Sequence, residues 1–219
     1  MNINDIYKLV SYMVDKYQGT YLSPDDFNMA INTAQRQYLS SILSESADIH
    51  QGGKRIKTGL KSDMTTNSSL TIFIKEATLT ITSQLASHPN DMYDILAIRT
   101  IDDNYAVKQV SADKIPSYIG NAIDAPTLTE PIYTEIGATF KFFPSTLSSA
   151  KIVYVKTPVD AAWVPDSGTL NYNSGTSTQL EWSISDINEI VYRALGIIGI
   201  NLKDGDLIRV SQTVKNDGQ

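Results

Sequence analysis

Residues 23–43 read SPDDFNMAINTAQRQYLSSIL, and this stretch carries a complete set of signals for a helix. Ser23 is a preferred N-cap residue, and Pro24 follows at the first helical position, where a missing N–H costs nothing. Asp25 and Asp26 then place negative charge at the positive end of the helix dipole. The apolar residues that follow recur at helical spacing and predict one buried face: Phe27, Ile31, Ala34, Tyr38 and Ile42.

The centre of this predicted helix is polar and consists of Gln35, Arg36 and Gln37. Arginine is enriched at protein interfaces because its planar group makes several hydrogen bonds in a fixed geometry. Side chains of these types suit hydrogen bonding to a partner protein. The alternative interpretation is that they simply face solvent, and the sequence leaves both open.

A second helix is predicted at the N-terminus, over residues 3–17, and Gly19 interrupts it. Only a short link joins it to the helix that begins after Ser23. We therefore expect the two to pack as an antiparallel helical hairpin over residues 1–49. Its apolar stripe consists of Ile3, Ile6, Tyr7, Val10, Val14 and Tyr17.

Residues 181–219 are predicted to form a C-terminal helical part. Ser183 or Ser185 is the expected cap, Gly199 the expected stop, and one more short helix is expected over residues 204–214. The predicted buried face of the main helix consists of Ile187, Ile190, Val191, Ala194, Leu195 and Ile198.

Residues 70–163 alternate in the manner of β-strands and predict a central antiparallel β region. Turns are expected at residues 102–104, at Gly137 and at Pro144. Helices, then strands, then helices indicate an α+β fold, and we expect one domain over residues 1–219. In the first strands the predicted inward residues are Ile72, Ile74, Leu79 and Ile81.

Two polar segments interrupt these elements and are predicted to be loops, over residues 50–69 and 164–180. The second contains Tyr172, a candidate for partner contact because tyrosine is enriched at interfaces. The first is basic and could contact nucleic acid or an acidic protein, although a solvated flexible loop explains it equally well. Its candidate contact residues are Lys54, Arg55, Lys57 and Lys61.

The overall composition excludes some classes of protein. The net charge of −6 and the pI near 4.9 argue against a general nucleic-acid binder, although an acidic wall would let DNA pass without adhesion. With no cysteine, the 219 residues can form no disulfide, thiolate zinc site or cysteine nucleophile. No apolar run has the length of a signal peptide or of a membrane span, so we expect no membrane partner.

No motif for catalysis, cofactor binding or metal binding is present in the sequence. The Walker and Rossmann glycine patterns are absent, and neither histidine has metal-ligand spacing. His50 and His88 lie in predicted loops, and we interpret His88, before Pro-Asn-Asp, as a solvated turn residue. We expect no catalytic residue, no cofactor and no metal.

Three segments together resemble a known class of protein. They are FNMAINTAQRQYLSSIL (27–43), PIYTEIGATFKFFPSTLSSAKIVYVKTP (131–158) and LEWSISDINEIVYRALGIIGINLKD (180–204). In this order they resemble the head-to-tail connector, or neck ring, proteins of tailed bacteriophages, most closely those of short-tailed crAss-like phages of gut Bacteroidota. The resemblance covers most of the chain but contains no catalytic signature.

The resemblance implies a structural virion protein without a reaction of its own, in which Gln35, Arg36 and Gln37 would be surface groups of an assembly helix in contact with a partner protein. Such proteins form a ring, commonly a dodecamer, that docks under the portal protein and receives the next neck or tail ring. The ring extends the channel through which DNA passes without sequence-specific binding. The implied location is the neck of the virion, with assembly in the host cytoplasm, and the two polar loops would become ordered on assembly.

Two other functions stay open. One is a virion-associated hydrolase acting on carbohydrate or peptidoglycan, for which Asp91 or Asp94 would be the acid to test. The other is a receptor-binding tail module. The predicted terminal helices argue against the second, since fibre tips are almost entirely β.

Overall fold

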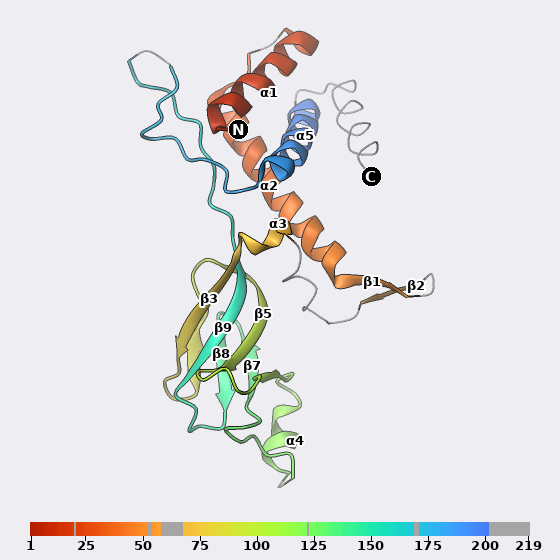
Figure 1. Ribbon diagram of the computed structural model, residues 1–219, viewed down its shortest axis with the longest axis vertical. Helices are drawn as coiled ribbons and strands as arrows, with labels where there is room; N and C mark the ends of the chain where they lie inside the picture. Colours follow the sequence, from red (N-terminus) through yellow and green to blue (C-terminus); the bar gives the residue numbers. More distant parts are fainter. Residues whose placement is uncertain (20, 52–53, 58–67, 122, 169–170, 202–219) are drawn as a thin grey trace. The chain divides into compact units, whose positions relative to one another are not determined.

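The computed structural model describes residues 1–19, 21–51, 54–57, 68–121, 123–168 and 171–201 (Figure 1). The chain divides into two compact units: a helical unit within residues 1–58 and 158–219, and a β unit within residues 59–157. We expected a single domain, whereas the β unit is inserted between two parts of the helical unit. The predicted α+β class is confirmed. Lys61 and the helix predicted over 204–214 lie outside the described residues.

Helix α1 (Ile3–Gln18) has a cap at each end. The side chain of Asn2 accepts a hydrogen bond from Asp5 N, and Asp5 Oδ2 accepts one from Asn2 N, which is a capping box. Gly19 ends the helix in the left-handed region, at φ 62°, where a glycine costs least. Four residues of the predicted stripe are fully buried, namely Ile3, Ile6, Val10 and Val14, and Tyr7 is half-buried, while the side chain of Tyr17 lies outside the description.

Helix α2 (Pro24–Ala47) begins where the sequence signals predict. Asp26 N donates to Ser23 Oγ at 3.1 Å, and the Ser23 hydroxyl donates to Asp26 Oδ2 at 2.6 Å. The predicted face is buried at Phe27, Ile31, Ala34 and Ile42, while Tyr38 is half-buried. Other segments cover more than one face of the helix, because four further residues are also buried: Ala30, Gln35, Leu39 and Leu43.

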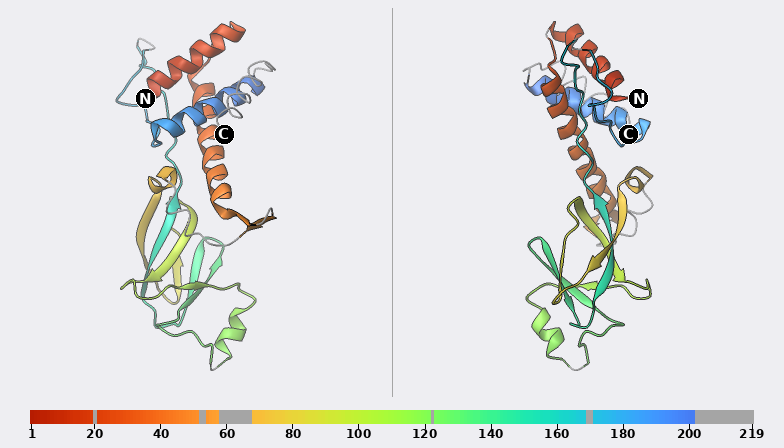
Figure 2. Two further views of the ribbon diagram at one scale, coloured as in Figure 1. Left: turned by 45° about the vertical axis from the view of Figure 1, so that its right-hand side comes forward. Right: turned by 90° about the vertical axis from the view of Figure 1, so that its left-hand side faces the viewer.

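Helix α5 (Ile184–Asn201) crosses and packs against α2 (Figure 2). The Tyr38 hydroxyl donates to Asp186 Oδ1 at 2.8 Å, and the Arg193 guanidinium lies 5.4 Å from the centre of the Tyr38 ring. All six apolar residues predicted for the inner face are buried. The predicted stop at Gly199 is wrong, because the helix continues to Asn201. A glycine inside a helix costs only about 1 kcal/mol, which packing readily offsets.

A β-hairpin follows α2 directly. Strands β1 (Asp48–Gln51) and β2 (Lys54–Lys57) pair antiparallel, with Ile49 opposite Ile56. The prediction of a loop beginning at residue 50 is therefore wrong in its first part. The missed signal is Gly52-Gly53, a two-residue glycine link between short runs, which is typical of hairpin turns.

The β unit contains two sheets that share one core (Figure 1). The first has the order β3-β9-β5 and is antiparallel, and the second has the order β4-β8-β7-β6, with β6 and β7 parallel. The elements are α3 (Ser68–Thr71), β3 (Ile74–Thr80), β4 (Leu85–Ser87), β5 (Met92–Thr100), β6 (Lys108–Gln109), α4 (Ile115–Ile119), β7 (Ile132–Ile136), β8 (Thr139–Phe143) and β9 (Ser149–Lys156).

Aromatic and aliphatic side chains from both sheets fill this core. Phe140 and Phe142 are fully buried, and the Tyr133 ring meets Phe140 edge to face at 5.7 Å. Leu79 and Ile81 are buried as predicted. Ile72 is exposed instead, because it lies in the turn before β3, where strand alternation has not yet begun.

The predicted turns of the β unit are confirmed. Gly137, at φ 60°, lies in the two-residue connection between β7 and β8, and Asp103 has a positive φ after β5. Pro144 follows β8 in a turn, after a cis peptide bond. These turns hold the strands in the order that the two sheets require.

Candidate interaction surface

The polar side chains of α2 bind the chain that returns from the β unit. Asn32 Nδ2 donates to Ala161 O at 2.9 Å, and Ala161 N donates to Asn32 Oδ1 at 2.8 Å. Asn28 makes the same pair of bonds with Trp163, at 3.0 and 2.7 Å. Four helical residues rise about 6 Å and two extended residues about 6.6 Å, so side chains four apart on the helix meet alternate residues of the returning chain.

Gln35 completes this row, which we call the amide ladder (Asn28, Asn32 and Gln35). Its Nε2 donates to Asn32 Oδ1 at 2.8 Å and to Val159 O at 3.2 Å, and its Oε1 accepts from Trp182 Nε1 at 3.3 Å. The residue is 1% exposed. The prediction that Gln35 is a surface group is therefore wrong: it lies at i+7 from Asn28, on the face that the returning chain covers.

Arg36 and Gln37 are on the surface of α2. Both carboxylate oxygens of Asp160 accept from Arg36 Nη2, at 2.6 and 2.9 Å, with the two side chains 55% and 59% exposed. An ion pair this exposed contributes only about 0–1 kcal/mol. Their contact with a partner protein stays a prediction.

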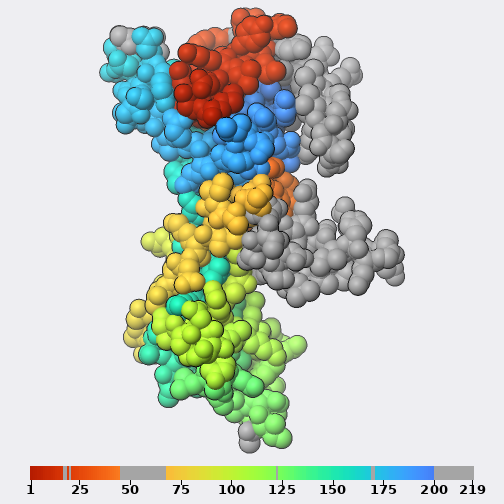
Figure 3. Space-filling model, viewed as in Figure 1, coloured from red at the N-terminus to blue at the C-terminus, as the bar shows by residue number. Residues whose placement is uncertain are grey.

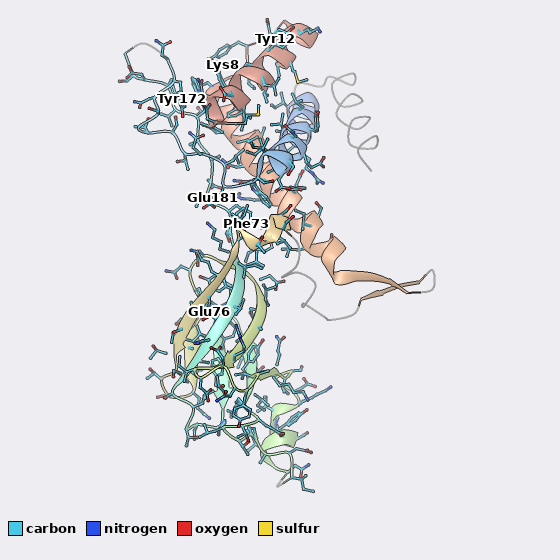
Figure 4. The ribbon with its side chains drawn as sticks, viewed as in Figure 1. Lys8, Tyr12, Phe73, Glu76, Tyr172 and Glu181 are labelled. Atoms are coloured by element: carbon cyan, nitrogen blue, oxygen red, sulfur yellow. The ribbon has the colours of Figure 1, made fainter. Side chains whose placement is uncertain are left out.

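Tyr172 lies inside a small aromatic group of the helical unit (Figure 4). Its ring is 6.3 Å from Trp163, which stacks on Tyr7 at 4.1 Å, and its hydroxyl accepts from Gln179 Nε2 at 2.9 Å. Burial and the neighbouring Tyr21 raise the pKa of Tyr7 to about 12. Tyr172 is thus half-buried within its own chain, and a partner contact there stays a prediction.

The segment predicted as a polar loop over 164–180 folds back on itself where it is described. Antiparallel bridges join Ala162 to Thr178 and Pro165 to Tyr172. The segment therefore has internal backbone pairing in the single chain, without a partner.

Several large apolar side chains of the helical unit face solvent. They include Tyr12 on α1 and Ile184 at the start of α5, with exposed fractions of 63% and 67%. Figure 3 shows α1, in red, forming part of the surface of the helical unit. A third group lies at the start of α2, and we call it the α2 N-terminal patch: Tyr21, Asp25, Asp26 and Met29.

The β unit carries its own exposed apolar residues beside α4: Ile119, Ile123 and Leu128. An open groove of about 560 Å³ lies nearby, lined in part by Lys108, Tyr118 and Glu130. The Lys108 ammonium lies 5.6 Å from the centre of the Tyr118 ring, so this cation already has a partner. The groove therefore presents a mixed polar wall rather than an apolar pocket.

The basic residues proposed for partner contact are only partly described. Lys54, Arg55 and Lys57 lie on β2, opposite Gln51, His50 and Asp48 in register. The hairpin thus brings three of the four predicted cations onto one strand.

The acids considered for hydrolysis are held in structural hydrogen bonds. Asp91 accepts from Lys75 Nζ at 2.6 Å and from the Tyr154 hydroxyl at 2.8 Å. Its hydrogen bond with Lys75, and then the one with Tyr154, lower the pKa of Asp91 below the ordinary value. Asp94 Oδ1 accepts from Ile95 N at 2.8 Å.

This arrangement predicts a pH dependence of stability. Because the folded-state pKa of Asp91 lies below the unfolded one, its stabilisation is present above the ordinary aspartate pKa of about 4. It is lost as the pH falls through the folded value. Urea unfolding followed by circular dichroism, repeated at several pH values, should show that stability falls less in acid for Asp91→Asn than for the wild type. Lys75→Met should also reduce this fall. If the free energy of unfolding of both variants changes with pH in parallel with the wild type, the assignment is contradicted.

His88 differs from its prediction as a solvated residue. Its ring stacks on Phe140 at 4.1 Å, and its side chain is 16% exposed. Nε2 lies 3.5 Å from Glu135 Oε1. The imidazole covers the edge of the β core, which a turn motif in the sequence does not indicate.

Among the described residues, no group of three or more histidine or acidic side chains could hold a metal ion. Over the same ranges, no helix combines the length and the apolar character needed to cross a membrane.

Comparison with known proteins adds no relative: no family model matches the chain, and no curated protein is similar to it.

Proposed function

We propose that this chain is a subunit of a ring in the neck of a tailed bacteriophage, where it joins the portal to the tail and extends the DNA channel. The observation that carries the proposal is that several large apolar side chains are exposed to solvent on a helical unit whose segments are joined by many internal hydrogen bonds. Tyr21 is 80% exposed and Ile184 67%. Large apolar and aromatic side chains exposed in this way are candidates for protein–protein contacts.

The bracing of the helical unit supports a ring function. A closed ring requires each subunit to present two surfaces at a fixed angle, so that the contacts meet after one full turn. The amide ladder holds residues 159–163 on α2, and Trp163 stacks on α1 through Tyr7. These bonds tie chain segments that are more than 100 residues apart into one body.

The charge of the chain is compatible with a DNA channel. At −6 the subunit repels phosphate, and twelve copies would repeat that charge around the ring. Repulsion limits adhesion of DNA to the wall, which a conduit requires.

The hydrolase alternative has less support. A general acid needs a pKa near the working pH, whereas the hydrogen bonds of Asp91 lower its pKa. We expect Asp91→Asn to lower stability at neutral pH, to reduce the further loss of stability in acid, and to leave any virion function of the folded protein intact.

Light scattering of the purified protein, alone and with the portal protein of the same virion, tests the proposal. A large closed species, formed spontaneously or only with the portal, is the expected result. A chain that stays monomeric in both conditions contradicts the ring function.

A further inference from the structure

We propose that the outer edge of strand β3 is an interaction surface that pairs antiparallel with the β3 edge of a second copy of this chain. One sheet would then continue from the β unit of one copy into the β unit of the other. This contact lies entirely within the β unit. It goes beyond the ring function proposed above and does not depend on it.

One edge of β3 has no backbone partner. The strand pairs with β9 over all seven residues without a shift of register (Figure 1). Lys156 N donates to Phe73 O at 2.8 Å before the strand, and Ile81 N donates to Ser148 O at 2.9 Å after it. Bonded residues alternate in an antiparallel pair, so the odd-numbered residues of β3 bond to β9 and the even-numbered ones point away. Within the described part of the chain, four residues make no backbone hydrogen bond on that outer side: Ile74, Glu76, Thr78 and Thr80.

The strand that follows in the sequence, β4, does not cover this edge. It is joined to β3 by a tight turn at Ser83 and Gln84, where one bridge links Thr82 to Leu85. Strand β4 then pairs with β8 in the other sheet. The outward side chains of β3 after Ile74 are all exposed. The edge is therefore open to a strand from outside.

The other strand edges of the β unit are short or already blocked. Strand β4 has three residues and β6 has two. On β5 the register with β9 shifts twice, and Ile95 N donates to Asp94 Oδ1 at 2.8 Å. Farther along β5, Ile98 O accepts from Val107 N at 2.8 Å. Short strands and bulges are the usual protection of an edge against pairing, and β3, long and regular, has neither.

The β3 edge is complementary to itself. In the antiparallel register that pairs all seven residues, Ile74 faces Thr80 of the second copy and Glu76 faces its Thr78. The two symmetric equivalents complete four bonded pairs, and with two bonds a pair the contact makes about eight backbone hydrogen bonds. Ala77 faces its own counterpart on the two-fold axis. One surface thus supplies both halves of the contact, as an isologous dimer requires.

The charges of β3 permit this register. Lys75 faces Leu79 and Glu76 faces a threonine, so no like charges stand directly opposite each other. The two Glu76 side chains lie diagonally across the axis, and each is already paired with Arg99 of its own chain at 3.3 Å. A shift by two residues toward the start of β3 would set Glu76 against Glu76, which disfavours that alternative.

A single cysteine tests the register. The chain has no cysteine, and Ala77→Cys places one thiol per copy on the two-fold axis. Cα atoms of a non-hydrogen-bonded pair lie about 4.5 Å apart, which is within the range for a disulfide. Mild oxidation should give one covalent dimer on denaturing gels. The matched control is Ala97→Cys, the same change at a half-buried position of β5, and it should stay monomeric on the gel.

A proline tests the edge. Thr78→Pro removes an N–H that points away from β9, so the pairing within the chain should persist and the circular dichroism should match the wild type. Dimerisation measured by light scattering over a concentration series should weaken at least tenfold. Thr78→Ala keeps the N–H and should dimerise like the wild type.

Several results would overturn the inference. They are a wild type with no dimer over the series, an Ala77→Cys variant that forms no covalent dimer, and equal cross-linking of Ala77→Cys and Ala97→Cys. Loss of the strand signal in Thr78→Pro would show that the edge is already paired, and unchanged dimerisation of that variant would show that the dimer forms elsewhere. The ring function is tested separately by assembly with the portal and stands in each of these cases.

Discussion

Gln35→Leu is expected to lower the free energy of unfolding of the helical unit by about 2–3 kcal/mol, because leucine cannot replace the three hydrogen bonds that the buried amide makes. The Trp182 indole is 5% exposed and donates to Gln35 Oε1. Leucine matches glutamine closely in volume, so little packing is lost. The carbonyl of Val159, itself half-exposed, can turn to water and adds less to the cost.

The measurement is urea unfolding followed by tryptophan fluorescence. Both tryptophans, Trp163 and Trp182, belong to the helical unit, so their signal reports that unit alone. Gln37→Leu is the matched control, since it makes the same chemical change on an exposed position of the same helix. We expect it to stay within about 0.5 kcal/mol of the wild type. Equal effects at the two positions would contradict the amide ladder.

Phe140→Ala is expected to destabilise the β unit by about 3–5 kcal/mol, the range for removing a large aromatic side chain from a core. Phe140 is fully buried and contacts residues of its own and neighbouring strands. Its ring lies 5.7 Å from Tyr133, 6.2 Å from Phe142 and 4.1 Å from His88. Alanine would leave a cavity between the two sheets.

Circular dichroism of the strands should show the loss, while the tryptophan transition of the helical unit moves less. Ile136→Ala, on the adjacent strand β7, is the control because its side chain is 53% exposed. An Ile136 variant as unstable as the Phe140 variant would show that the core between the sheets has been assigned incorrectly.

Helix positions were predictable because one periodicity governs them. The apolar stripes of α1, α2 and α5 repeat at about 3.6 residues. The buried face of each helix can therefore be predicted without knowing which element covers it. The start of α2 was also predictable, since Ser23, Pro24 and Asp26 act within one turn of the chain. Turn residues act locally as well, which is why the turns at Gly137 and Asp103 were found.

The role of Gln35 was not predictable from its surroundings in sequence. It stands beside Arg36 and Gln37, which are exposed, and its hydrogen-bond partners Val159 and Trp182 are more than 120 residues away. A polar residue is stable in a core only when distant groups satisfy it, and sequence spacing alone does not reveal those groups. The spacing of Asn28, Asn32 and Gln35 at i, i+4 and i+7 was the available sign.

The sequence by itself determined the α+β class, the apolar faces of the helices, the capped start of α2 and the main turns, because each depends on interactions within a few residues. Only the tertiary structure decided that the β unit is an insertion and that Gln35 is buried. Those features depend on which distant segments meet, and that outcome reflects packing and hydrogen-bond satisfaction over the whole chain.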